Sequence, residues 1–219
     1  MARSLTRVFY GLTFVGCALP GVFLLRDALP VLVPAFFPAV VVPWSGDLGV
    51  NPVETLLHET GRAGLMVLIL TLAVTPIRRL TGWNRVQSVR RMMGLWAFGY
   101  AVSHFLTYVV FDKLGRVREI VADVVERPFI FMGMTALVIL TALAVTSTNG
   151  MIRRLGRRWQ RLHRLVYVAA VAGVIHFAWG QKADIREPLL WGAALAVLLA
   201  ARVFLAWRRR VRQPATGAA

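Results

Sequence analysis

The sequence predicts an all-α fold: a polytopic membrane helix bundle with six transmembrane helices, a single domain over 1–219, and both termini cytoplasmic. The chain of 219 residues is 58% hydrophobic with a mean hydropathy of +0.63, which is more apolar than a soluble domain of this size requires. The apolar residues gather in runs of about 20, the length that crosses a bilayer. The basic residues flank these runs, as membrane orientation requires.

The six helices are predicted at about 8–25, 56–77, 92–111, 129–147, 162–180 and 189–207. Between the first two, the segment 28–43 is apolar but rich in proline: it contains Pro30, Pro34, Pro38 and Pro43. Proline removes a backbone donor, which opposes a regular helix. A spanning segment must satisfy its backbone internally, so we expect 28–43 to be an interfacial loop.

The connection 112–127 has a different pattern, because apolar residues recur at helical spacing among charged ones. These residues are Val117, Ile120, Val121, Val124 and Val125. The pattern predicts a short amphipathic helix that lies on the membrane surface.

Orientation follows from the basic residues. If the N-terminus is inside, most of the 26 Lys and Arg residues fall in the inner segments, and all ten Asp and Glu fall on the outer side. The positive-inside rule then predicts cytoplasmic termini. The formal charge of +16 therefore reflects membrane orientation, and we expect no nucleic acid partner. The outer acids suggest that a partner docks there.

Cys17 is the only cysteine. A disulfide within the chain, a cysteine-ligated iron–sulfur cluster and covalent attachment of haem through CxxCH are therefore excluded. A redox centre in this protein must be held by histidine or without covalent bonds.

Two histidines are predicted at matching depths. His104 lies in the outer half of the third helix and His176 in the outer half of the fifth. Two imidazoles that face each other across a bundle are what a six-coordinate b-type haem needs. The alternatives are that each histidine only hydrogen-bonds a neighbouring helix, or that the pair binds zinc, for which no further ligand lies at this depth.

His163 precedes His176 by thirteen residues, about 20 Å of helix, and is predicted at the inner face. A second haem would need a partner there, but the third helix carries Arg90 and Arg91 at that level. We therefore expect a flavin phosphate or quinone headgroup held by His163 with Arg78, Arg90 and Arg91. The alternatives are a second haem at this site and an interfacial histidine that binds nothing.

His58 and Arg62 begin the second helix. We expect His58 to bond locally to Glu54 or Glu59, with a role at an outer site as the alternative. Arg62 lies one turn deeper, where an unpaired charge is costly. Its predicted partners are Glu59 at i,i+3 and a haem propionate.

Six stretches carry a resemblance to a known family: HETGR, RRMMGLWAFGYAVSHFLTY, ERPFIFMG, ALAVTST, LGRRWQRLHRLVYV and IHFAWG. They resemble MsrQ, the haem-binding membrane subunits of bacterial periplasmic methionine sulfoxide reductase systems, within the broader ferric reductase-like transmembrane group. The resemblance implies a bacterial inner-membrane protein with haem b on His104 and His176 and a non-covalent FMN. The broader group has two histidines on each of two helices, and here Arg90 or Arg91 replaces one of them.

The resemblance also implies the partners. Electrons would come from the quinone pool or a cytoplasmic flavin reductase, and would pass to a periplasmic molybdenum-cofactor reductase that repairs oxidised methionines. No side chain here is arranged for bond-making chemistry, so we expect sulfoxide reduction to be the partner's work. The rival interpretations are a stand-alone ferric or oxygen-reducing reductase, and a non-redox scaffold or transporter.

Overall fold

A computed structural model describes residues 2–36, 48, 50–181 and 184–212 of the chain. These residues form the following helices in order: α1 (Ala2–Phe36), α2 (Pro52–Thr81), η1 (Asn84–Val89), α3 (Arg90–Thr107), η2 (Tyr108–Asp112), α4 (Val117–Glu126), α5 (Pro128–Val145), α6 (Asn149–Leu155), α7 (Arg157–Leu162), η3 (His163–Leu165), α8 (Val166–Gly180) and α9 (Arg186–Arg212). The predicted all-α class is confirmed.

Six helical stretches are long and apolar enough to cross a membrane, as the sequence predicts. They are Leu5–Leu29, Pro52–Thr81, Asn84–Asp112, Pro128–Val145, Arg157–Gly180 and Arg186–Arg208. Two of them change their winding. A π-helical turn, η2, ends the third span, and a 3₁₀ turn, η3, interrupts the fifth at His163.

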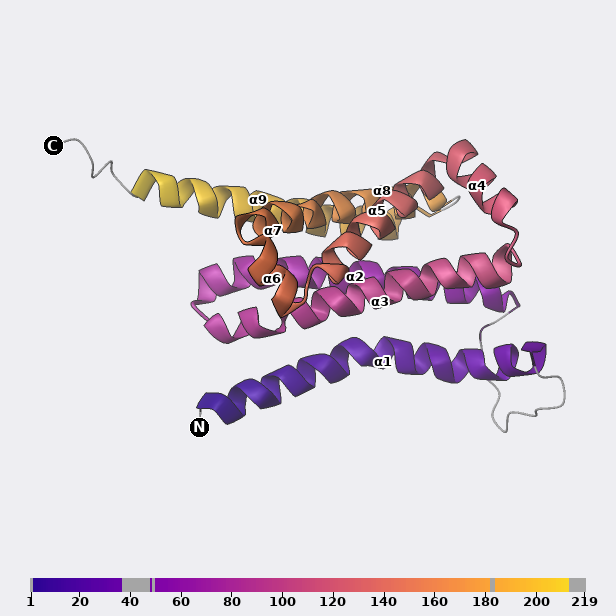
Figure 1. Cartoon of the computed structure of the whole chain (residues 1–219), viewed down its shortest axis with the longest axis horizontal. Helices are drawn as coiled ribbons and strands as arrows, with labels where there is room; N and C mark the ends of the chain where they lie inside the picture. Colours follow the sequence, from indigo (N-terminus) through magenta and orange to yellow (C-terminus); the bar gives the residue numbers. More distant parts are fainter. Residues whose placement is uncertain (1, 37–47, 49, 182–183, 213–219) are drawn as a thin grey trace.

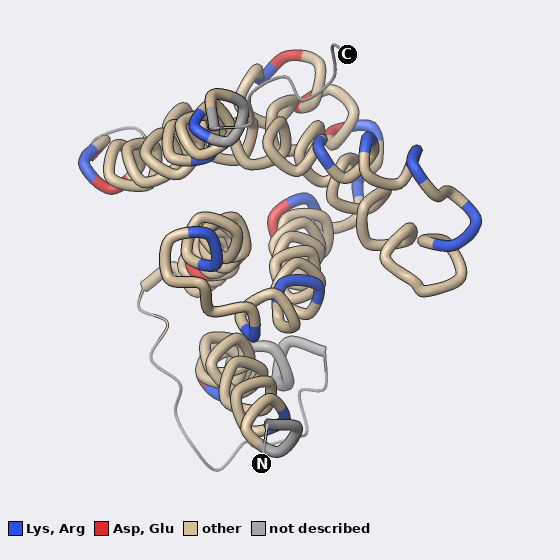
Figure 2. Tube along the Cα trace, turned by 90° about the vertical axis from the view of Figure 1, so that its left-hand side faces the viewer, with Lys and Arg blue, Asp and Glu red and all other residues tan. Residues whose placement is uncertain are grey.

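The helices stack in three tiers. Helix α1 lies below α2 and α3, while α5, α8 and α9 lie above them (Figures 1 and 2). The centre is α2, because 61% of its most apolar stretch is buried against at most 22% in the other spans. Leu72 and Val67 of this helix are among the most buried side chains of the protein. The outer helices α1 and α9 leave large apolar side chains exposed, which suits contact with lipid.

The predicted loop over 28–43 is wrong for its first half. Helix α1 continues through Pro30 and Pro34 to Phe36, and residues 37–43 lie outside the described part. Each proline removes one backbone donor but leaves the other helical bonds intact, and membrane helices tolerate such interruptions. Pro30 and Pro34 therefore do not end this helix, which continues past its predicted end near residue 25.

Two other prolines open the helical backbone, and a neighbouring helix repairs each opening. Beside Pro20, the Tyr100 hydroxyl of α3 inserts between two groups of α1: it accepts from the Gly21 N–H at 2.8 Å and donates to the Cys17 carbonyl at 2.7 Å. In α2, Pro76 lacks the N–H that would bond the Leu72 carbonyl. That carbonyl instead accepts from Arg202 of α9 at 2.8 Å.

The predicted amphipathic helix is present as α4. Val117, Val121 and Val125 repeat every four residues along it and are all exposed. This exposed apolar stripe fits a helix that rests on a membrane surface.

The bundle has two unlike ends. The end formed by the end of α2, η1, the start of α3, α6 and α7 is called the basic end here, and Figure 2 looks onto it, with Lys and Arg in blue. The opposite end, formed by the start of α2, α4 and the start of α5, is called the acidic end, because the described Asp and Glu residues lie there. Helix α1 begins and α9 ends at the basic end (Figure 1).

Candidate functional site

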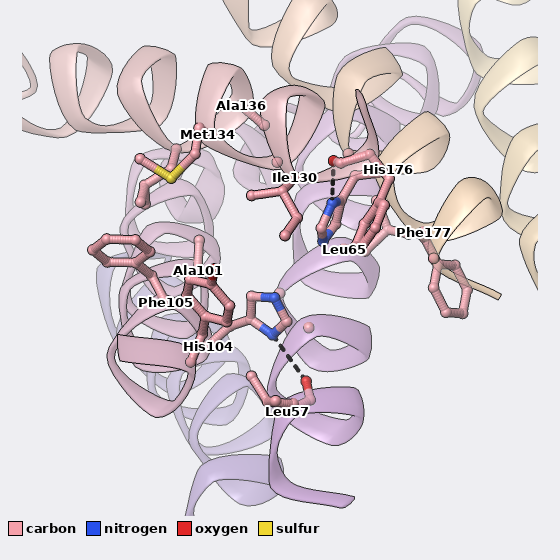
Figure 3. A pocket seen from close by; sticks show the side chains of 18 of the residues that line it. Leu57, Leu65, Ala101, His104, Phe105, Ile130, Met134, Ala136, His176 and Phe177 are labelled. Atoms are coloured by element: carbon pink, nitrogen blue, oxygen red, sulfur yellow. Dashed lines mark hydrogen bonds between the residues drawn. The ribbon is translucent and has the colours of Figure 1, made fainter. Parts of the chain in front are cut away.

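A cavity of about 350 Å³ lies between α2, α3, α5 and α8, towards the acidic end. Its walls are mostly apolar, with Leu65 of α2, Phe105 of α3, Ile130 of α5 and Phe177 of α8 among the side chains in Figure 3. His104 and His176 enter the cavity from different helices. Such a pocket, apolar with few convergent polar groups, is typical of a cofactor site.

His104 is held by α2. Its Nδ1 lies 2.9 Å from the Leu57 carbonyl oxygen, which requires the proton on Nδ1. The ring lies against Gly61, where a Cβ would be 3.1 Å from Nδ1. Any larger residue at 61 would push the ring. The bond to Leu57 leaves Nε2 as an unprotonated acceptor facing the cavity.

His176 is held by α5 in the same way. Its Nδ1 lies 2.7 Å from the Phe129 carbonyl oxygen, and a Cβ at Gly133 would be 2.8 Å from that nitrogen. No side chain fits between the α5 backbone and this ring. Here too the second nitrogen remains free to bind a metal.

The two histidines are oriented by the same arrangement of a backbone carbonyl and a glycine. Each histidine lies 47 residues after the carbonyl that orients it, and each glycine follows that carbonyl by four residues, one helical turn. The hairpin α2–α3 and the pair α5–α8 therefore present their histidines alike, from opposite walls of the cavity.

The two rings suit one metal between them. Their centroids are 5.9 Å apart and their planes are 83° to one another, and Figure 3 shows their second nitrogens turned towards each other. A metal–imidazole bond is about 2 Å long, so ring centres on opposite sides of one metal lie about 6 Å apart. No group of three or more His, Cys, Asp or Glu that could hold a metal occurs among the described residues. The donor set thus fits a haem, which supplies its own four nitrogens, better than zinc.

His58 and Arg62 also line this cavity, on α2. Arg62 pairs with Glu59, as predicted, and its Nε lies 2.7 Å from Glu187 of α9. Two carboxylates of the protein therefore already bind this guanidinium, which ties α2 to α9. The role of Arg62 towards a propionate, and that of His58 at an outer site, remain predictions.

A second polar group at the acidic end was not anticipated. Asp123 of α4 is 7% exposed. It accepts from Lys113 Nζ at 2.7 Å, from Tyr108 Oη at 2.6 Å and from Arg127 Nε at 3.0 Å. The pKa of Asp123 is lowered, mainly by the hydrogen bond from Lys113 and next by that from Tyr108. The same hydrogen bond to Asp123 raises the pKa of Lys113. Asp123 thus anchors α4 and is not free to meet a partner, whereas Glu119 and Glu126 are exposed.

His163 lies near the basic end, away from the cavity. Its Nδ1 is 3.2 Å from the Trp159 carbonyl, its ring stacks on Trp159 at 3.8 Å, and its Nε2 is 3.5 Å from the Ser147 hydroxyl. Of the arginines predicted to join it, Arg91 donates to Asn149 at 2.6 Å. No hydrogen bond or cation–π interaction joins His163 to Arg78 or Arg90 among the described residues.

Sequence reasoning missed Arg202 and Tyr167. Arg202 donates to the Tyr167 hydroxyl and to the Leu72 carbonyl, and its guanidinium carbon lies 4.9 Å from the Tyr167 ring centre. Two signals were present in the sequence: an arginine inside an apolar span, and Pro76 inside another.

Comparison with known proteins gives the class of the protein. Residues 60–174 match the family model of the ferric reductase-like transmembrane component. This match, over more than half of the chain, defines the class of the protein as a membrane protein of the ferric reductase-like group.

Curated relatives narrow the class. A protein-methionine-sulfoxide reductase heme-binding subunit MsrQ from Herminiimonas arsenicoxydans is 50% identical over 172 residues, 77% of this chain and 79% of the relative. The MsrQ of Rhodospirillum rubrum is 50% identical over 166 residues, 75% and 80% of the two chains. That of Bordetella pertussis is 43% identical over 202 residues, 88% and 98%. The chain belongs to the MsrQ family.

Proposed function

We propose that the protein is a membrane electron-transfer subunit that binds one b-type haem between His104 and His176 and delivers electrons to a protein-methionine-sulfoxide reductase partner. The observation that carries this proposal is the pair of imidazoles, 5.9 Å apart, whose free nitrogens face each other in an apolar cavity. The relatives' description as heme-binding subunits of that reductase supports it.

The residues of the chain contribute orientation and exclusion of water. The Leu57 and Phe129 carbonyls hold both rings in the tautomer that would bind iron through Nε2, and a hydrogen bond from Nδ1 makes each imidazole more basic. Apolar walls from α2, α3, α5 and α8 keep water from the centre. When bound, the haem supplies reversible one-electron chemistry between ferric and ferrous iron.

We propose an orientation with both termini in the cytoplasm of a bacterium and the protein in its inner membrane. Most of the Lys and Arg residues lie at the basic end. Cytoplasmic loops of membrane proteins carry an excess of Lys and Arg, so we assign the basic end to the cytoplasm. The cavity would then open towards the periplasm, where a periplasmic molybdenum-cofactor reductase could receive electrons. The quinone pool or a cytoplasmic flavin reductase, with FMN as a second cofactor, would supply them from the basic end.

The test is a reduced-minus-oxidised optical spectrum of the purified protein. We expect a haem b spectrum in the parent, and loss of most bound haem in His104→Ala and in His176→Ala, because each change removes one of the two imidazoles that would hold the iron. His58→Ala, which lines the same cavity, should keep most of its haem. Full haem retention in both ligand variants would overturn the assignment.

A further inference from the structure

An arginine inside the sixth span has only neutral partners. Arg202 lies six residues before Arg208, about 9 Å deeper along α9. Its guanidinium donates to the Leu72 carbonyl and the Tyr167 hydroxyl, and neither carries a charge. A cation in a transmembrane helix normally faces a counter-charge or a ligand pathway, so the charge of Arg202 needs an explanation.

Two further arginines act on the same place. Arg79 at the end of α2 and Arg90 at the start of α3 are close enough for their charges to act on Arg202. All three are partly buried. Arg202 therefore experiences positive charge from two other helices at the basic end, and like charges in a medium of low dielectric repel one another.

No acid of the chain relieves this repulsion. The sequence has no Asp or Glu in 60–111, in 127–181 or in 188–212, and these ranges contain the parts of the described helices that form this end of the bundle. No acidic side chain in these parts of the described helices can therefore supply a counter-charge to Arg202.

Unused hydrogen-bond donors lie at the same place. The buried Nε atoms of Arg79 and Arg202 and the buried hydroxyl of Thr75 have no partner in the described part of the chain. Thr75 precedes Arg79 by four residues, so both lie on one face of α2. Buried donors without a partner are rare in folded proteins, and here they accompany an excess of positive charge.

We propose that Arg79, Arg90 and Arg202 bind a phosphate group between α2, α3 and α9. The guanidinium fork matches phosphate oxygens, and basic pockets between transmembrane helices bind anionic lipid headgroups on the cytoplasmic side. The phosphate belongs either to an anionic phospholipid of the adjacent leaflet or to a soluble phosphate ester. The inference rests on the proposed function only for naming this end cytoplasmic, since the charges and donors exist without the haem.

A purely structural role for Arg202 would explain less. Capping the Leu72 carbonyl uses one nitrogen of one arginine, and it does not explain why the buried Nε of Arg79 has no partner in the described part of the chain. The two explanations differ in what happens when Arg79 and Arg90 are neutralised and the cap is left in place.

The test uses the full-length protein with Arg79→Gln and Arg90→Gln combined, because replacing Arg202 would also break its bond to α2. The matched control combines Arg153→Gln and Arg154→Gln, which are exposed on α6 at the same end and remove the same charge. Native mass spectrometry would measure phosphatidylglycerol retained from a mixture with phosphatidylcholine. We expect about tenfold lower retention in the Arg79/Arg90 variant, the factor that one lost hydrogen bond to a charged group produces, and parental retention in the control.

A second arm identifies the source of the phosphate. Protein in phosphatidylcholine nanodiscs is titrated with riboflavin 5′-phosphate, with riboflavin, and with inorganic phosphate as competitor. Weaker binding of only the phosphorylated flavin in the Arg79/Arg90 variant would assign the site to a soluble ester, and an effect on phosphatidylglycerol alone would assign it to lipid. Equal binding of all probes by variant and control would overturn the proposal. The haem spectrum is read separately, so its absence would count against the proposed function only.

Discussion

At the scale of single residues, the candidate haem site depends on two glycines as much as on its two histidines. His104 and His176 bond to backbone carbonyls, and those bonds are possible only because Gly61 and Gly133 let each ring approach the neighbouring helix. A Cβ at 133 would lie 2.8 Å from the ring, closer than side chains tolerate, whereas one at 61 would lie at 3.1 Å.

We therefore predict that Gly133→Ala lowers haem content and alters the haem spectrum more than Gly61→Ala does. The added methyl must displace His176 or spread α5 from α8, and a misplaced ligand costs affinity. Haem per protein, measured by pyridine haemochrome, checks this. Gly99→Ala on α3 is the control, because no atom outside its own helix lies within 4 Å of that Cβ. Parental haem content in Gly133→Ala would contradict the prediction.

At the scale of elements, the repair of proline breaks by neighbouring helices ties the tiers together. Tyr100 joins α3 to α1, and Arg202 joins α9 to α2. Each of these side chains bonds a backbone group that lacks its helical partner near a proline. The effects of replacing the proline and of replacing the side chain should therefore not be additive.

We predict that Arg202→Met lowers the stability of the parent protein more than it lowers the stability of a protein that already carries Pro76→Ala. With alanine at 76, the backbone N–H can bond the Leu72 carbonyl, which then no longer needs Arg202. An unsatisfied buried carbonyl costs about 1–3 kcal/mol, and the coupling in the double-mutant cycle should reach at least the lower value. Thermal or denaturant unfolding in detergent measures it. Identical effects of Arg202→Met in both backgrounds would show that the bond to Leu72 contributes nothing.

The elements were predictable from sequence to different degrees. The six spans and the shared depth of His104 and His176 follow from apolar length and helical rise, which depend on local sequence alone. The end of α1 was misplaced, because whether a proline ends a helix depends on the surrounding structure. The burial of Asp123 was also missed, since its partners Lys113 and Tyr108 meet it only through the turn at Gly115, and Gly133 gave no signal without knowledge of which helix His176 packs against.

At the scale of the whole molecule, the basic and acidic ends define an axis across the membrane. Six spans place the start of α1 and the end of α9 on one side (Figure 1), and the excess of Lys and Arg predicts that this side is the cytoplasm.

We predict that a reporter fused after Gly217 is active only in the cytoplasm and that one inserted near Gly115 is active only in the periplasm. A reporter such as alkaline phosphatase, which needs periplasmic disulfides, and a fluorescent protein that matures in the cytoplasm would measure this in paired fusions. A periplasmic signal after Gly217 would reverse the proposed direction of electron flow.

The near-perpendicular setting of the two imidazoles, 83° between their planes, has an electronic consequence for a haem held between them. Each ring donates π-electron density to the iron d orbital perpendicular to its own plane. Parallel rings favour one of the two orbitals and split their energies, whereas crossed rings act on both nearly equally. The ferric, low-spin form should therefore show a strongly anisotropic electron paramagnetic resonance spectrum with an unusually large principal g value. An ordinary rhombic spectrum would mean that the rings turn parallel when iron binds.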